Sequence, residues 1–246
     1  MARLGTSALM AAALTLAMVP AATAQANCTA EPAPAADLSG CDLSRVNLSG
    51  KDLHGINLSA ARLENADLRG AVLTGANLRG TNLKWANLQK ADVRDADLTG
   101  AQLFHTILDE ADISGSVLRR ANMFGAKVNF TKAVGADLTS AYLKDVNMEG
   151  ADMSGASLTD AYMLRAVMLD GKFTGARIIG SDLTGASADG AVFTDADLTG
   201  TRLSGASAIG ADFSRARLKG ADFSNAVLRD AKFDGATDGP RAGTAP

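Results

Sequence analysis

Large apolar residues recur at every fifth position from Leu38 to Phe233, without a single insertion or deletion. The first units read ADLSG, CDLSR, VNLSG and KDLHG, and the last, residues 231–235, reads AKFDG. We call the third residue of each unit its centre and number the five slots accordingly. The forty centres are 23 Leu, 5 Met, 5 Phe, 3 Ala, 2 Val and 2 Ile. This spacing does not match the 3.6-residue period of an amphipathic helix, so a helical chain is a poor interpretation.

The first slot holds a small residue in most units: Ala in 28 of the forty, and Thr, Ser or Gly in seven more, whereas Val46, Lys51, Ile56 and Val146 depart from this pattern. A spacing of two places the first slot and the centre on the same side of an extended chain. Each unit is therefore predicted to be a short strand that points one small and one large side chain inward. Asp or Asn fills twenty of the forty second slots, and Gly is frequent in the fifth slot. Both suit turns, so a turn after every strand makes a coil rather than a flat sheet.

The number of sides follows from a second, longer period, because identical core residues tend to stack in successive coils. Several core residues recur at a spacing of twenty: Phe173, Phe193, Phe213 and Phe233; Ala188 and Ala208; Met148 and Met168. Twenty residues are four units, which predicts four sides. Forty units then give about ten coils and, at about 4.8 Å between paired strands, a rod of roughly 48 Å.

Units such as ADLTG, ANLRG and ADFSR resemble the A-(D/N)-L-x-x consensus of the pentapeptide-repeat protein family. The resemblance covers residues 36–235 in one unbroken register. It implies an all-β fold, a right-handed quadrilateral parallel β-helix, which agrees with the twenty-residue count. No proline occurs between residues 36 and 235. That absence fits strands whose N–H groups all bond to a neighbouring coil.

The N-terminal residues 1–26 are predicted to be a signal peptide. Arg3 supplies a positive charge, residues 4–19 form an apolar stretch, and the run AATAQA offers cleavage after Ala24 or Ala26. A membrane span is the alternative, but the stretch is short and is interrupted by glycine, serine and threonine. We therefore expect an exported protein, either periplasmic or secreted.

Cys28 and Cys41 lie thirteen residues apart at the start of the expected mature chain. In an oxidising compartment such a pair favours a disulfide over a metal site, because no nearby histidine could complete a zinc shell. Two free buried thiols are the alternative. The bond would pin residues 27–35 onto the first coil as an N-terminal cap. At the other end, residues 236–246 are predicted to be a flexible tail.

Charge argues against nucleic acid as a partner. Without Arg3 the mature chain has 23 basic and 27 acidic residues, a net charge of −4, whereas phosphate binding needs a basic surface. The family resemblance implies a different possibility, since some members imitate DNA and shield type II topoisomerases. That function needs a dense acidic surface and a cytosolic address. Here acidic residues alternate with Arg and Lys, and the predicted signal directs export.

Catalytic chemistry is not expected. His54 and His105 are predicted to lie on different sides, about two and a half coils apart, and no nucleophile elbow, phosphate-binding loop or zinc-protease motif occurs. The acidic group Asp109, Glu110 and Asp112 is explained by the turn preferences of the repeat. We therefore predict neither an enzyme nor a cofactor or metal.

Aromatic residues gather on one side of the predicted rod. The aromatic side has the centres Leu83, Leu103, Met123, Leu143 and Met163, and its outward residues include Trp85, Phe104, Phe124, Tyr142 and Tyr162. We call these five rings the aromatic strip; it holds the only Trp and both Tyr of the chain. Exposed apolar patches with a polar rim, here Lys84, Lys144 and Arg165, usually mark interaction sites. The alternative is that stacked rings only reinforce neighbouring coils.

The strip predicts a binding or scaffold role, with a protein, a glycan or an envelope surface as partner. An ice-binding array is a poor alternative, because its best column of threonines, which runs from Thr99 to Thr199, is interrupted by Arg119 and Ile179. A homodimer through the C-terminal coil is a further possibility. The last coils carry Phe213, Phe223 and Phe233, and an unpaired strand edge invites pairing with another edge.

Overall fold

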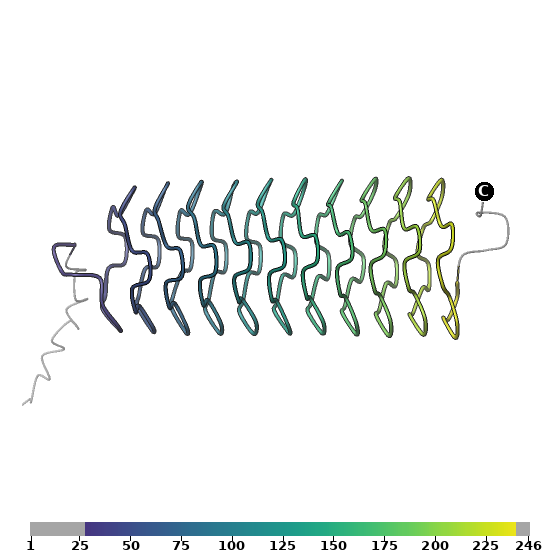
Figure 1. Ribbon diagram of the computed structural model, residues 1–246, viewed down its shortest axis with the longest axis horizontal. Helices are drawn as coiled ribbons and strands as arrows, with labels where there is room; N and C mark the ends of the chain where they lie inside the picture. Colours follow the sequence, from purple (N-terminus) through teal and green to yellow (C-terminus); the bar gives the residue numbers. More distant parts are fainter. Residues whose placement is uncertain (1–27, 240–246) are drawn as a thin grey trace, which may run out of the picture.

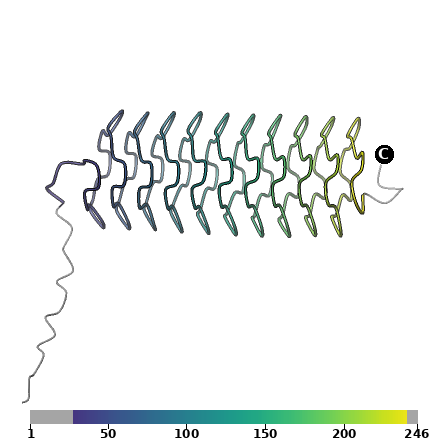
Figure 2. The same cartoon turned by 90° about the horizontal axis from the view of Figure 1, so that it is seen from below.

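The protein is an elongated rod of stacked coils. The structure is a computed structural model that describes residues 28–239 (Figure 1). The first coils lie at one end and the last coils at the other, as the second view confirms (Figures 1 and 2). Within residues 28–239 no helix has the length and apolar character needed to cross a membrane. The predicted signal peptide, residues 1–26, lies outside the described residues.

Parallel β-bridges join each coil to the next. Every bridge links the second slot of a unit to the residue twenty positions on, from Asp37 with Asn57 to Arg217 with Thr237. Bridges begin at residues 37, 42, 47 and 52 before the pattern repeats, so the rod has four sides, as the twenty-residue period predicted. In the part of the chain that the structure describes, each unit contributes one bridged residue and no longer strand. The short strand predicted for each unit is thus a single bridged residue, and the count of about ten coils stays a prediction.

A tight turn forms each corner of the rod. In the first unit, the N–H of Cys41 donates to the carbonyl oxygen of Leu38 at 3.2 Å. Gly40 in the fifth slot has a φ of 67°, as in a type II turn. The carboxylate of Asp37 accepts a bond from the N–H of Ser39 at 3.0 Å, which explains the Asp and Asn preference of the second slot. Residues other than glycine also take the fifth slot, at a cost of about 1–2 kcal/mol each.

The core is a continuous column of centres and small first-slot residues. Phe173, Phe193 and Phe213 are completely buried, and their rings stack with centroids 5.1 and 4.9 Å apart. Ala188 and Ala208 are also buried. Each of these alanines shares its coil with Phe193 or Phe213, so a large ring accompanies each small centre. This pairing conserves core volume at two of the positions where alanine replaces a large centre.

Hydroxyl groups replace alanine in several first slots and point into the core. Thr106 Oγ1, for example, donates to the carbonyl oxygen of Leu83 at 2.8 Å. The same bond, to the carbonyl 23 residues earlier, is made by Thr81, Thr131, Ser181 and Thr201. No buried side-chain nitrogen or oxygen lacks a partner within residues 28–239. These hydroxyls are therefore compatible with a dry core.

The N-terminal segment is fastened to the first coil. The predicted disulfide between Cys28 and Cys41 is present, and the N–H of Ala35 donates to the carbonyl oxygen of His54 at 2.9 Å. Cys41 occupies an inward first slot and is only 1% exposed. In the same coil, Lys51 occupies a first slot but is exposed and lies 3.9 Å from Glu31. The disulfide thus holds the cap at an end of the rod where the core is still incomplete.

Removing the disulfide is expected to destabilise the N-terminal end. The double variant Cys28→Ala, Cys41→Ala should lose about 3 kcal/mol, because the bond closes a loop of thirteen residues. Alanine is the usual first-slot residue, so the core beside position 41 stays filled and packing loss is small. Urea unfolding, with hydrogen exchange of residues 28–60, measures the effect. Equal stability and equal exchange protection in variant and wild type would contradict this role.

The C-terminal end extends slightly beyond the predicted repeat. Thr237 still bridges to Arg217, and its N–H donates to the carbonyl oxygen of Ala216 at 2.9 Å, so the ladder passes residue 235 by two residues. Leu228 and Phe233 are only half-buried. Within residues 28–239 their N–H groups have no backbone partner. Homodimerisation through this coil stays a prediction, and residues 240–246 of the predicted tail lie outside the described part.

Candidate functional site

The five rings of the aromatic strip occupy three different slots of their units. Tyr142 and Tyr162 take second slots and bridge to each other, whereas Phe104 and Phe124 take fourth slots. Trp85 occupies a fifth slot with a φ of 60°. A bulky residue rarely adopts this left-handed conformation, which makes the tryptophan a costly choice at a corner where glycine is common.

The structure brings all five rings together in one continuous ladder. Ring centroids are 5.5 Å apart from Trp85 to Phe104, 5.3 Å from Phe104 to Phe124, 6.3 Å from Phe124 to Tyr142 and 5.2 Å from Tyr142 to Tyr162. The first contact is edge-to-face, and the other three are stacked with interplanar angles of 13–22°. Neighbours twenty or so residues apart thus lie in the order that the sequence predicted.

His105 packs against the strip, although it was not among the five site residues that the sequence predicted. Its ring stacks on Trp85 with centroids 4.4 Å apart and meets Phe104 edge-on at 4.3 Å. Its Nδ1 lies 3.1 Å from the carbonyl oxygen of Gly125. A Cβ at position 125 would collide with the imidazole, so the glycine makes room for it. The sequence does indicate this stacking, because His105 follows Trp85 by twenty residues in the same slot and therefore lies one coil further along the same side.

The strip exposes less apolar surface than its outward positions predict. Trp85 is 54% exposed and Tyr142 is 38% exposed. Phe104, Phe124 and Tyr162 are half-buried, because each ring covers part of its neighbour. The ladder therefore also stabilises the coils, as the alternative interpretation required. Phe130, on the next side, is 62% exposed and stands outside the ladder.

Charged side chains flank the strip. Lys144 Nζ lies 5.8 Å from the centroid of Phe124, a cation–π contact. Arg165 donates two bonds to the carboxylate of Asp145, at 2.8 and 2.7 Å, and these bonds lower the pKa of Asp145. With Lys84, the flank holds three cations and one anion. These four flanking side chains carry a net charge of +2, on a chain whose formal net charge is −3.

His54 and the acids Asp109 and Glu110 have separate partners on the rod. His54 pairs with Asp52 at 2.9 Å, far from His105 in the ladder. Asp109 accepts bonds from Asn129, and Glu110 pairs with Lys90 at 3.4 Å, so both acids serve the surface of the rod. Over residues 28–239 no three His, Cys, Asp or Glu side chains form a cluster that could hold a metal ion.

Comparison with known proteins identifies the repeat. A family model described as "Pentapeptide repeats (8 copies)" matches most of the chain. The matched segments are residues 36–75, 56–95, 81–120, 96–129, 121–160, 172–207 and 209–237. No curated protein sequence matches the chain.

Several solved structures are similar. HetL, a pentapeptide repeat protein involved in heterocyst differentiation regulation in the cyanobacterium Nostoc sp. strain PCC 7120, is 29% identical, with 82% of this chain and 87% of that chain covered and a TM-score of 0.33. QnrB1, a plasmid-mediated fluoroquinolone resistance protein, is 20% identical in a trypsin-treated form, with 82% and 90% covered and a TM-score of 0.47. Rfr23 from the cyanobacterium Cyanothece 51142 is 26% identical, with 50% and 87% covered and a TM-score of 0.30.

Proposed function

The chain belongs to the pentapeptide-repeat family, whose members fold as right-handed quadrilateral β-helices, and we propose that it is an exported binding or scaffold rod without enzymatic activity. In this proposal a rod of about ten coils contacts a protein of the cell envelope through the aromatic strip. Members of the family are generally structural or binding proteins rather than enzymes. The disulfide between Cys28 and Cys41 supports export, because such bonds persist in oxidising compartments.

The observation that carries the proposal is the concentration of rings on one side. Six aromatic or imidazole side chains form one ladder there, including the only Trp and both Tyr. The core does not require them, because the centres beneath them, such as Leu103 and Met123, are already buried. Tryptophan and tyrosine are also the residues most enriched at the energetic centres of interfaces.

The way the rings stack favours a protein over a glycan as partner. Phe124 has Phe104 stacked on one side and Tyr142 on the other, and Tyr142 lies between Phe124 and Tyr162. These inner rings therefore offer their edges, whereas a sugar that stacks on an aromatic residue needs an exposed ring face. Ring edges carry a partial positive charge and suit carbonyl or carboxylate oxygens of a protein.

The charges beside the strip agree with this choice. Arg165 and Asp145 neutralise each other, which leaves Lys84 and Lys144 as the source of the local charge of +2. A partner surface with acidic residues around an apolar centre would complement this pattern. The interface is modest, since the strip extends over about four coil spacings, or roughly 19 Å.

A DNA-like function is less well supported. Many carboxylates on the rod lie beside arginines, such as Asp67 with Arg69 at 2.6 Å and Asp182 with Arg202 at 2.9 Å. The arginine bond is the largest cause of the lowered pKa of Asp67. Surface acids that are individually neutralised do not generate the strong continuous negative field of a DNA backbone.

A pair of matched variants tests the proposed contact surface. Trp85→Gly and Phe130→Gly each remove an exposed aromatic ring from a fifth slot with positive φ, where glycine is the favoured residue. Only the first lies in the strip. With the mature protein as bait in an envelope extract, we expect Trp85→Gly to weaken capture of a specific protein by about thirtyfold or more, as for a hot-spot tryptophan.

Phe130→Gly is expected to capture the same protein as well as wild type does. Mass spectrometry of the captured material, followed by titration of the purified partner, gives the comparison. If both variants retain the partner, or both lose it, the strip is not the contact surface.

A further inference from the structure

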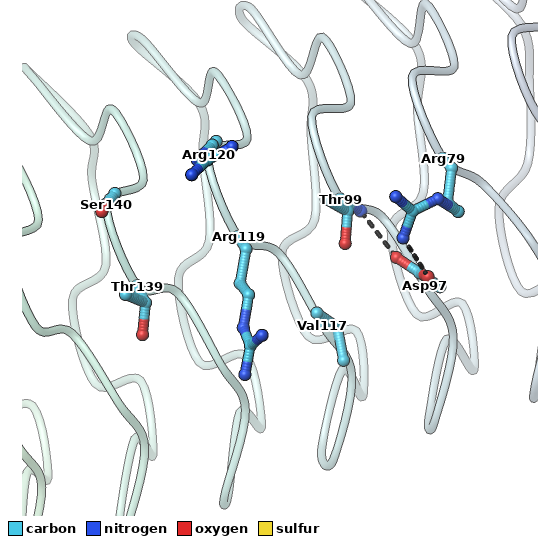
Figure 3. Close-up of a pocket in the computed structure, with 8 residues that line it drawn as sticks. All are labelled: Arg79, Asp97, Thr99, Val117, Arg119, Arg120, Thr139 and Ser140. Atoms are coloured by element: carbon cyan, nitrogen blue, oxygen red, sulfur yellow. Dashed lines mark hydrogen bonds and ion pairs between the residues drawn. The ribbon is translucent and has the colours of Figure 1, made fainter.

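A pocket of about 630 Å³ lies on the side next to the aromatic strip, which we call the arginine side. This side has the buried centres Leu78, Leu98, Leu118 and Leu138. Figure 3 shows the pocket between successive coils. Its lining residues are Arg79, Asp97, Thr99, Val117, Arg119, Arg120, Thr139 and Ser140.

The sequence explains why a hollow forms at this place. Two diagonal ion pairs cross between coils, Arg79 with Asp97 at 2.8 Å and Arg119 with Asp137. Between these pairs, Thr99 takes the fourth slot that Arg79 and Arg119 occupy in the neighbouring coils, and Val117 takes the second slot that Asp97 and Asp137 occupy; Figure 3 shows Thr99 and Val117. Both side chains are short, and Val117 interrupts the run of acids between Asp97 and Asp137. Two long ion pairs therefore flank a gap with an apolar base.

The corner beside the gap is open as well. In the fifth slots below Arg120 stand Gly80 and Gly100, and a Cβ added at either position would meet no atom within 4 Å. The same slot holds Arg120, Ser140 and Asp160 in the three coils that follow Gly100. A molecule in the pocket can thus reach Arg120 from the open side, and the hydroxyls of Thr99 and Ser140 lie among the lining groups.

Arg120 is the charge in the pocket that the rod does not neutralise. Arg79 and Arg119 each have an acidic partner, whereas Arg120 has no ion-pair partner among residues 28–239. With Asp137, the partner of Arg119, counted as well, three guanidinium groups stand beside two carboxylates, which is a net charge of +1 on an acidic chain. Arg120 also adopts a φ of 55°, a conformation that glycine reaches without steric conflict. The geometry of the turn therefore does not explain why position 120 holds an arginine.

We propose that this pocket binds a small molecule bearing an oxyanion, a carboxylate or a phosphate monoester, with Arg120 as its main charge partner. A guanidinium can donate two parallel bonds to such a group, and neighbouring hydroxyls add further donors. The pocket and the strip lie on different sides, so this site is independent of the protein contact proposed above.

The test uses a substitution that is not expected to destabilise the rod. Arg120→Gly removes the charge at a residue with positive φ, so the variant is expected to be at least as stable as wild type. The matched control is Arg45→Gly, because Arg45 also has positive φ, a value of 60°, and no ion-pair partner among the described residues. Both variants lose one positive charge, but only the first changes the pocket.

The probes are inorganic phosphate and acetate, titrated at constant ionic strength into the mature protein and followed by amide chemical shifts. Saturable shifts confined to the units of Thr99, Arg120 and Ser140 are expected. Arg120→Gly should weaken binding about tenfold, the loss of one charge-assisted contact, and Arg45→Gly should leave it unchanged. A stronger response to phosphate than to acetate would identify a phosphate ester as the ligand group, and the reverse a carboxylate. Absence of saturation with both probes, or equal weakening in both variants, overturns the proposal.

Discussion

Replacing Phe193 by alanine is expected to lower the free energy of unfolding by about 3–5 kcal/mol, the largest stability effect of any single change considered for this rod. The ring of Phe193 is completely buried and lies between Phe173 and Phe213, at centroid distances of 5.1 and 4.9 Å. Alanine would leave a cavity between two phenyl rings. The neighbouring centre in the same coil, Ala188, is itself too small to fill it. Urea unfolding measures the loss.

Phe233→Ala is the matched control for this prediction. Phe233 belongs to the same column and stacks on Phe213 at 5.1 Å, but it is only half-buried at the end of the described ladder. The decrease in the free energy of unfolding should therefore be clearly smaller for Phe233→Ala than for Phe193→Ala. Equal losses for the two variants would mean that the Phe column does not stabilise the rod through two-sided stacking.

The period of the sequence predicted that the backbone forms a four-sided coil, and the parallel bridges twenty residues apart confirm it. In a coil, each residue has the same environment as the residue one turn away, so Phe173, Phe193 and Phe213 repeat because they pack on one another. The order of the strip followed from the same rule, since Phe104 and Phe124 are twenty residues apart. The disulfide was accessible too, because only two cysteines occur and both lie beside the first coil.

The sequence did not predict the contacts and the burial of the outward side chains, because these depend on the direction in which each side chain points. The period places the Cα atoms, but it does not show that the ring of His105 lies against Gly125 of one neighbouring coil and stacks on Trp85 of the other. It also does not show that stacking half-buries Phe104 and Phe124. The pocket beside Arg120 depends on which way each long arginine leans. Arg79 and Arg119 form ion pairs with acids of the next coil, and Val117 lines the pocket between the two pairs.

A triple variant, Phe104→Ser, Phe124→Ser and Tyr142→Ser, is expected to abolish partner capture while the rod still folds. Serine occupies the same slots elsewhere, as in Ser44 and Ser157, so the turns and bridges remain possible. The substitutions remove six ring pairs, four within the strip and two with His105, and for such partly exposed rings each contributes at the lower end of roughly 0.5–1.5 kcal/mol. We therefore expect the free energy of unfolding to fall by about 2–4 kcal/mol, with cooperative unfolding retained. Capture should weaken by about a hundredfold or more.

Phe193→Ala separates loss of contact from loss of stability in this experiment. It destabilises the rod by a similar amount, yet Phe193 lies on a different side and one coil beyond Tyr162, the last ring of the strip. Because each coil of a solenoid contacts mainly its neighbours, most of the strip should stay unaltered in that variant. Capture retained by Phe193→Ala and lost by the triple variant would assign the rings to the interface. Should the triple variant unfold, or lose capture only to the extent that Phe193→Ala does, the ladder serves to reinforce the coils and the partner binds elsewhere.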